Sequence, residues 1–251
     1  MERDPTLLEA LRSAKRVAVL TGAGISAESG IPTFRDAQTG LWARFRAEDL
    51  ASPEAFERDP QLVWDWYAMR RELVTQAAPN PGHYALAELE RRAPSFLLAT
   101  QNVDGLHQRA GSQQVIELHG NIGRVKCSAE GVIVESWEPG PGVPRCPGCG
   151  ALLRPDVVWF GELLPAGAFG KAQQAVRNAD LVFTIGTSGL VPPAATLPLL
   201  AAEAGALVVE INLNETYLTP YMSHSLRGPS GEILPALVKA AWPDAGGPDG
   251  V

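Results

Sequence analysis

The segment that decides the fold reads Val17-Ala-Val-Leu-Thr-Gly-Ala-Gly-Ile-Ser-Ala27 and joins an apolar run to a glycine-rich turn. The run is typical of a buried strand, and Gly22, Gly24 and Ala27 fit the G-x-G-x-x-G/A spacing of a dinucleotide-binding turn. Small residues there let the backbone approach a pyrophosphate at the N-terminus of a helix. A dehydrogenase would continue this helix toward a second strand, whereas Gly30-Ile-Pro32 breaks it within a few residues.

Further apolar runs predict the rest of a parallel sheet. They recur at residues 96–99, 115–118, 181–185 and 207–211, and helical patterns such as 84–92 and 168–178 separate most of them. This alternation is typical of an α/β fold with a doubly wound parallel (Rossmann-like) sheet. An N-terminal amphipathic helix, capped by Asp4 with Pro5 at its first position, is expected to pack on the sheet.

Two stretches interrupt the alternation and predict a smaller domain. Residues 36–76 carry aromatic side chains at largely helical spacing and predict a helical insertion over the nucleotide cleft. Residues 122–156 are rich in Gly and Pro, carry all three cysteines, and predict a zinc-ribbon-like lobe. The remaining segments, 1–35, 77–121 and 157–242, form the predicted Rossmann-like nucleotide-binding domain, and residues 243–251 are expected to be a disordered tail.

The composition favours a soluble acidic enzyme. The 251 residues carry 21 basic and 28 acidic side chains, a net charge of -7, and the pI is near 5.2, so no overall basic field attracts nucleic acid or an anionic membrane. The N-terminus lacks the apolar core of a signal peptide, and no apolar run approaches the ~20 residues of a membrane span. We therefore expect a cytoplasmic protein, in which three cysteines suit a metal site better than a disulfide framework.

Four more motifs follow in series after the first hundred residues. They read Thr100-Gln-Asn-Val-Asp-Gly-Leu-His107, Glu117-Leu-His-Gly120, Arg154-Pro-Asp-Val-Val-Trp-Phe-Gly-Glu162 and Gly186-Thr-Ser-Gly-Leu-Val-Pro192. With the glycine-rich turn, in this order and spacing, they resemble the sirtuins, the NAD-dependent protein-lysine deacylases, across nearly the whole chain. The resemblance implies that NAD and a substrate peptide meet in the cleft between the sheet and the smaller domain.

Within these motifs, the resemblance implies that His119 is the catalytic base, with Asn102 and Asp104 positioning the ribose and carboxamide of NAD. In sirtuins the acyl-lysine oxygen attacks the ribose carbon as nicotinamide leaves, and the base deprotonates a ribose hydroxyl that then attacks the acyl carbon. Imidazole suits this task because its unperturbed pKa is about 6.5. Two alternatives remain open: His119 could be a structural histidine, and Asp104 could form an Asx turn that caps a helix.

The other cofactor contacts implied by the resemblance come mainly from loops that follow the predicted strands. Arg35 offers a planar fork for a phosphate or carboxamide, and Phe34 offers a ring that shields the ribose from water. The complete set is Gly22, Ala23, Gly24, Ile25, Pro32, Thr33, Phe34, Arg35, Gln101, Asn102, Asp104, Gly186, Thr187, Ser188, Asn212, Leu213, Asn214 and Ser230.

Substrate contacts are predicted in two places. Tyr67 and Arg70 are three residues apart on a predicted helix and share a face, so we expect them to line an acyl pocket. In one sirtuin branch, the desuccinylase and demalonylase branch, a Tyr-x-x-Arg pair at this place binds the carboxylate of succinyl-, malonyl- or glutaryl-lysine; the alternative is that Arg70 points to solvent. The resemblance also implies that the substrate peptide binds as an added strand between segments that contain Val158, Phe160, Gly161 and Val191.

The cysteines depart from the family pattern. Sirtuins usually hold a tetrahedral Zn²⁺ with two Cys-x-x-Cys pairs, whereas here Cys127, Cys146 and Cys149 supply three thiols and Glu130 stands at the fourth position. Three thiolates with Glu130 or a water would hold a structural zinc more weakly, and a metal-free lobe is the alternative.

The predicted function is NAD-dependent removal of succinyl, malonyl and also acetyl groups from protein lysines, which releases nicotinamide and O-acyl-ADP-ribose. The expected partners are acyl-lysine proteins, with neither nucleic acid nor membrane, and the chain is expected to be a monomer. Two alternatives stay open. One is a mono-ADP-ribosyltransferase that shares the nicotinamide-releasing step, and the other is a non-catalytic NAD or ADP-ribose sensor on the same fold.

Overall fold

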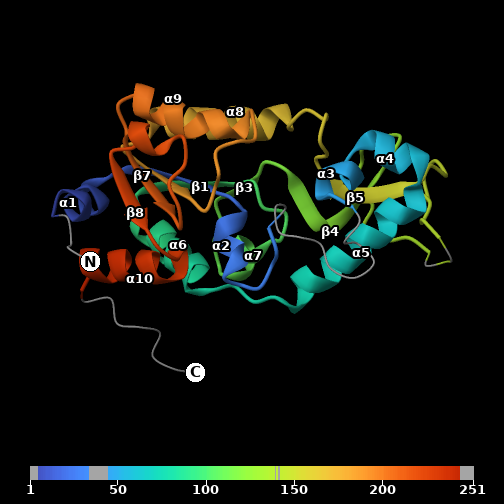
Figure 1. Ribbon diagram of the computed structural model, residues 1–251, viewed down its shortest axis with the longest axis horizontal. Coiled ribbons are helices and arrows are strands. Elements are labelled where there is room, and N and C mark those ends of the chain that lie inside the picture. Colours follow the sequence, from blue (N-terminus) through green and yellow to red (C-terminus); the bar gives the residue numbers. More distant parts are fainter. Residues whose placement is uncertain (1–4, 34–44, 139, 141, 244–251) are drawn as a thin grey trace.

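A six-stranded sheet forms the centre of the computed structural model, which describes residues 5–33, 45–138, 140 and 142–243. The strand order is β3-β2-β1-β6-β7-β8, and every neighbouring pair is parallel, as the sequence predicts (Figure 1). The strands are β1 (Arg16–Thr21), β2 (Ser95–Thr100), β3 (Val115–Glu117), β6 (Leu181–Ile185), β7 (Leu207–Asn212) and β8 (His224–Arg227).

Helices cover both faces of this sheet (Figure 1). On one face, α1 (Pro5–Ser13), α6 (Pro81–Arg92) and α10 (Ser230–Ala241) share an apolar core with the strands. On the other face, α8 (Ala166–Asn178) and α9 (Leu197–Glu203) form a second core. Because the central strands are buried on both sides, β1 and β6 read as continuous apolar runs rather than as alternating ones.

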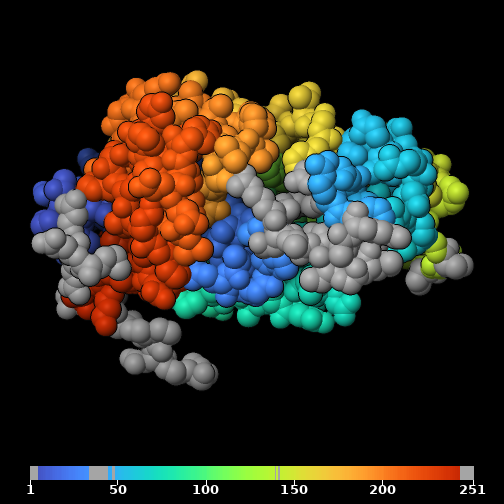
Figure 2. Space-filling view, in the orientation of Figure 1, coloured from blue at the N-terminus to red at the C-terminus, as the bar shows by residue number. Residues whose placement is uncertain are grey.

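A small lobe lies beside the sheet. It contains α3 (Ala47–Leu50), α4 (Pro53–Arg58), α5 (Pro60–Gln76) and an antiparallel pair, β4 (Gly120–Cys127) and β5 (Leu153–Val157). The space-filling view shows its cyan helices well apart from the orange and red end of the sheet (Figure 2). Trp66, Ile122 and Val157 belong to a core of this lobe's own, so the lobe is stabilised by its own packing.

Local sequence signals account for the helices of the small lobe. The Oγ of Ser52 accepts the Ala55 N–H at the start of α4, and the carboxylate of Asp59 accepts the Leu62 N–H at the start of α5. Each helix carries proline in its first turn, where the missing N–H costs no hydrogen bond. Among the described residues, no helix combines the length and apolar character of a membrane span. The predicted cap Asp4 and the predicted tail beyond residue 243 lie outside the described residues.

The parallel strands deliver their following loops to one edge of the sheet. Here β1 is followed by the short helix α2 (Ala23–Ala27), and β2 is followed by α7 (Leu106–Arg109). The strand order reverses between β1 and β6, and ligands of doubly wound sheets bind at such a switch point.

Candidate active site

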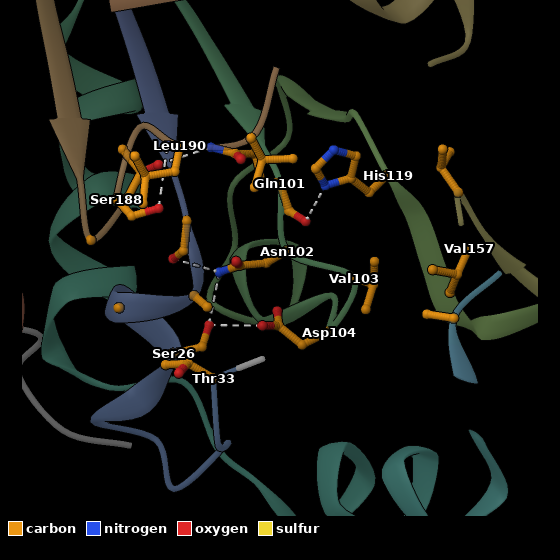
Figure 3. A pocket seen from close by; sticks show the side chains of 18 of the residues that line it. Ser26, Thr33, Gln101, Asn102, Val103, Asp104, His119, Val157, Ser188 and Leu190 are labelled. Carbon is orange, nitrogen blue, oxygen red and sulfur yellow. Dashed lines mark hydrogen bonds between the residues drawn. The ribbon is translucent and has the colours of Figure 1, made fainter. Parts of the chain in front are cut away.

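A cavity of about 660 Å³ opens at this edge of the sheet, between the strand ends and the small lobe. Sites that enclose small molecules and cofactors typically measure about 300–1,000 Å³. Figure 3 shows its polar wall. The predicted residues that line it are Gly22, Ala23, Gly24, Pro32, Thr33, Tyr67, Arg70, Gln101, Asn102, Asp104, His119, Val158, Phe160, Gly161, Gly186, Thr187, Ser188, Val191, Asn212 and Asn214.

The glycine-rich turn packs directly on the loop that follows β6. The Gly24 N–H donates to the Gly186 carbonyl at 2.8 Å, and a Cβ on Gly24 would lie only 2.6 Å from the Gly186 Cα. The Gly22 N–H donates to the Ile185 carbonyl. These two N–H groups are therefore used within the protein, and the absence of side chains on the two glycines lets the turn pack closely on the β6 loop.

Side chains hold the β6 loop from both sides. The Gln101 Nε2 donates to the Thr187 Oγ1 at 3.1 Å, and the Asn212 Nδ2 donates to the Thr187 carbonyl at 2.9 Å. The loops after β2, β6 and β7 are thus joined into one wall of the cavity.

Asn102 is fixed by its amide nitrogen. Its Nδ2 donates to the Gly22 carbonyl at 3.1 Å and to the Ser26 Oγ at 3.0 Å, and both bonds are drawn in Figure 3. No described residue donates to its Oδ1, so this oxygen remains for a ligand. Asn102 is 8% exposed, and a buried amide with one unused acceptor is suited to binding a polar ligand group.

Asp104 forms the Asx turn that was the alternative interpretation of this residue. Its Oδ1 accepts the Leu106 N–H at 2.9 Å, which is the Asx turn that begins α7, and its Oδ2 accepts the Ser26 hydroxyl at 2.7 Å. The same residue lines the cavity. Burial raises the pKa of its carboxyl group, and the bonds from Leu106 and Ser26 oppose that rise.

His119 lies in the turn between β3 and β4, where the chain passes from the sheet to the small lobe. Its Nδ1 is 2.9 Å from the Gln101 carbonyl, as drawn in Figure 3. Because a carbonyl only accepts, Nδ1 carries the proton and the neutral ring keeps its lone pair on Nε2. Burial lowers the pKa of His119 and the carbonyl bond opposes this, so the ring is neutral at neutral pH and can accept a proton.

Tyr67 and Arg70 lie one turn apart on α5 and line the cavity from the small lobe. They are 1% and 9% exposed, so the alternative that Arg70 points to solvent is wrong. The Arg70 Cζ lies 5.2 Å from the centre of the Trp66 ring. Burial lowers the pKa of Arg70 and raises that of Tyr67, and both groups remain protonated donors at neutral pH.

The three cysteines gather at the far end of the small lobe. Their sulfur atoms all lie within 4.8 Å of one another, and the Cys127 and Cys149 Sγ atoms are 3.4 Å apart. Tetrahedral zinc with bonds of about 2.3 Å places sulfurs about 3.8 Å apart, so the thiols fit three of its four corners. Glu130 donates its backbone N–H to the Cys127 Sγ, but no carboxylate of the described residues belongs to the cluster.

Some predicted cofactor contacts do not line the cavity. Ile25 is fully buried in the core beneath the sheet, Leu213 is 63% exposed, and the Ser230 hydroxyl donates to Glu28 at the start of α10. Phe34 and Arg35 lie outside the described residues.

Comparison with known proteins places these features in one family. The description "Sir2 family" matches residues 22–193, a span that runs from the glycine-rich turn past the β6 loop. This chain belongs to the Sir2 family. The Sir2 match thus covers the turn, His119, the Tyr67 and Arg70 pair, and the three cysteines.

Relatives match nearly the whole Sir2 chain. An NAD-dependent protein deacylase of Thermus thermophilus is 56% identical over 245 residues, which cover 95% of each chain. A crystal structure of a Sir2 homologue–NAD complex has a TM-score of 0.90 at 50% identity and covers 96% of this chain and 94% of its own. A structure of Sir2 bound to acetylated peptide has a TM-score of 0.83 at 33% identity, and the match covers 94% of this chain and 97% of that chain.

Several cavity residues of this Sir2 protein went unpredicted. Ser26 joins Asn102 to Asp104, and Trp159 lines the cavity between the predicted substrate contacts Val158 and Phe160. Tyr217 also lines it and donates its hydroxyl to the Gly189 carbonyl. Ser26 had a signal, since a serine buried in a short helix needs a polar partner. Tyr217 follows the last core strand in an ordinary loop and offers none.

Proposed function

We propose that the protein is an NAD-dependent protein-lysine deacylase that prefers acidic acyl groups, namely succinyl and malonyl, and also removes acetyl. The observation that carries the proposal is the neutral His119, whose Nε2 is left as a base in a cavity that also holds a buried cation at Arg70. Three relatives that are 50%, 51% and 56% identical to this chain are named NAD-dependent protein deacylases, which supports the general activity.

The cavity has two ends, which we call the nucleotide end and the acyl end. The nucleotide end comprises the glycine-rich turn, Gln101, Asn102, Asp104 and Asn212, and it would hold NAD. The acyl end comprises Tyr67, Arg70 and Trp159. His119 also lines the cavity, and the segments around Phe160 and Val191 would bind the substrate backbone as an added strand.

The residues fit this chemistry. When bound, NAD supplies a ribose carbon with nicotinamide as leaving group and an ADP-ribose unit that receives the acyl group. His119 accepts, at Nε2, the proton of the hydroxyl that attacks the acyl carbon, while the Gln101 carbonyl holds the ring in the required tautomer. Asn102 presents Oδ1 to the ligand because its nitrogen is fixed on Gly22 and Ser26.

The acyl end supports the acidic preference. Arg70 brings a positive charge to the wall of the cavity, and a ligand carboxylate matches both that charge and the planar fork of the guanidinium. For the cysteine lobe we propose a structural zinc on Cys127, Cys146 and Cys149, which would stabilise the lobe from outside the cavity.

The test uses matched acetyl-, succinyl- and malonyl-lysine peptides, incubated with and without NAD and followed by mass spectrometry. NAD-dependent loss of acyl mass together with O-acyl-ADP-ribose supports the proposal, and faster loss of the acidic groups supports the preference. Mass gain on an acceptor protein without deacylation would instead identify a mono-ADP-ribosyltransferase. Binding of NAD without any turnover would identify a sensor.

A further inference from the structure

Trp159 is hydrogen-bonded to the tyrosine of the acyl end. Its Nε1 lies 2.9 Å from the Tyr67 Oη, and both side chains are buried, at 2% and 1% exposed. An indole N–H can only donate, so the Tyr67 oxygen must be the acceptor of this bond. The hydroxyl proton of Tyr67 then has no freedom to point at Trp159.

The Tyr67 proton has no acceptor within the described part of the chain. Burial raises the pKa of the phenol, so the proton stays on the oxygen at neutral pH. A buried hydroxyl donor without an acceptor is costly unless a ligand supplies one. Both Tyr67 and the neighbouring cation Arg70 line the cavity, where a ligand carboxylate, which only accepts, would bind the two donors together.

The indole itself is held on several sides. The Arg154 Cζ lies 3.3 Å from the centre of the Trp159 ring, and the Phe56 ring lies 5.3 Å from it at a tilt. Arg154 forms a two-pronged ion pair with Glu162, and the Glu162 Oε2 also accepts the Trp159 backbone N–H at 2.8 Å. This clamp fixes the direction in which the indole N–H points.

We propose that Trp159 is a positioning residue for acyl specificity, which holds the Tyr67 hydroxyl as a donor toward the distal carboxylate of an acidic acyl-lysine. The inference rests on the proposed acidic preference and adds the group that orients it. Trp159 contacts neither reacting atoms nor cofactor in this role and acts through Tyr67 alone.

The test compares Trp159→Phe, Tyr67→Phe and the double variant on succinyl- and acetyl-lysine peptides of one sequence. We expect Trp159→Phe to raise the KM for the succinyl peptide about fivefold to tenfold, the effect of one hydrogen bond, with a much smaller change in kcat. In the Tyr67→Phe background the same substitution should add almost nothing, because the hydroxyl that it orients is absent. Trp242→Phe is the matched control, since Trp242 packs against Arg92 outside the cavity and should leave the acyl ratio unchanged.

The assignment is overturned by an equal KM change for both peptides, or by a full succinyl effect that persists without the Tyr67 hydroxyl. If Trp159→Phe does not fold, Glu162→Gln loosens the clamp and should shift the ratio in the same direction by a smaller factor. Arg70→Met distinguishes a failure of the Trp159 proposal from a failure of the proposed acidic preference. If Arg70→Met also leaves the acyl ratio unchanged, the acidic preference itself has failed. A ratio that responds to Arg70→Met but not to Trp159→Phe overturns only the role of Trp159.

Discussion

The two ends of the cavity are built on different principles. At the nucleotide end, Asn102, Asp104 and Gln101 are each bonded to a neighbouring loop, so the wall is set before any ligand arrives. At the acyl end, Tyr67 keeps a buried donor for which the described chain offers no acceptor. The nucleotide end would bind the same cofactor in every reaction and can therefore be rigid. The acyl end would bind acyl groups that differ, and it keeps a hydrogen-bond donor that only some of these groups can satisfy.

Removing the base should slow the reaction for every acyl group while both ends of the cavity keep their structure. His119→Ala is expected to lower kcat/KM about 10²-fold to 10⁴-fold for every acyl peptide, because the substitution removes the lone pair at Nε2 that accepts the proton. Calorimetric binding of ADP-ribose serves as the control for folding, since the nucleotide end remains intact. Activity within tenfold of the parent protein would show that His119 is not the base.

Neutralising the cation should affect only the acyl end. Arg70→Met is expected to lower the succinyl-to-acetyl ratio of kcat/KM about 10-fold to 100-fold, the range of one or two charge-assisted hydrogen bonds. The control is Arg58→Met, which removes an exposed arginine at the end of α4. The acyl preference has another origin if both variants give the same ratio.

Acid should lower the stability of the fold through two buried histidines that lie near the nucleotide end. His83 and His107 are buried with ring centres 4.9 Å apart, and the His107 Nε2 lies 2.9 Å from the Thr21 Oγ1 at the end of β1. Burial lowers the pKa of His83 to about 4 and that of His107 to about 3. Between about pH 6.5 and pH 4 these two histidines are therefore protonated in the unfolded chain but neutral in the folded chain. The free energy of unfolding falls as the pH falls through this window.

Urea unfolding at pH 7, 6 and 5 measures this loss. The free energy of unfolding should fall by up to about 1.4 kcal/mol per pH unit for each histidine well inside the window. His83→Gln should flatten the slope, because one of the two protons is no longer involved. A slope identical to that of the parent protein would show that His83 does not titrate in this way.

The smallest effect on catalysis should come from the cysteine lobe. Cys146→Ser, or treatment with a chelator, is expected to lower the melting temperature by about 2–4 °C per kcal/mol lost, since a chain of this size has a large unfolding entropy. The value of kcat should hardly change, because none of the cysteines lines the cavity. A loss of kcat comparable to that of His119→Ala would mean that the lobe shapes the nucleotide end directly.

The parts that the sequence predicted well depend on local patterns. The apolar runs of β1 and β6 and the break after α2 follow from burial and backbone preference, and the motif residues that end the strands reach the cavity because parallel strands finish at one edge. The antiparallel pair of β4 and β5 was not predicted. Pro155 lies within β5, and a proline in the sequence argues against a strand, although a sheet of only two strands can accommodate it. The tie from Trp159 to Tyr67 spans 92 residues and leaves no trace in periodicity or spacing.

Two of the connections between the lobes meet at the base. The chain leaves the sheet through His119 into β4, it returns after β5, and there the Val158 N–H donates to the His119 carbonyl at 2.9 Å. The imidazole is therefore carried by a backbone segment that connects the two lobes, and a change in the angle between the lobes would act on that segment. The hydrogen bond between Val158 and His119 therefore links the backbone of the base to a segment that is proposed to bind the substrate peptide.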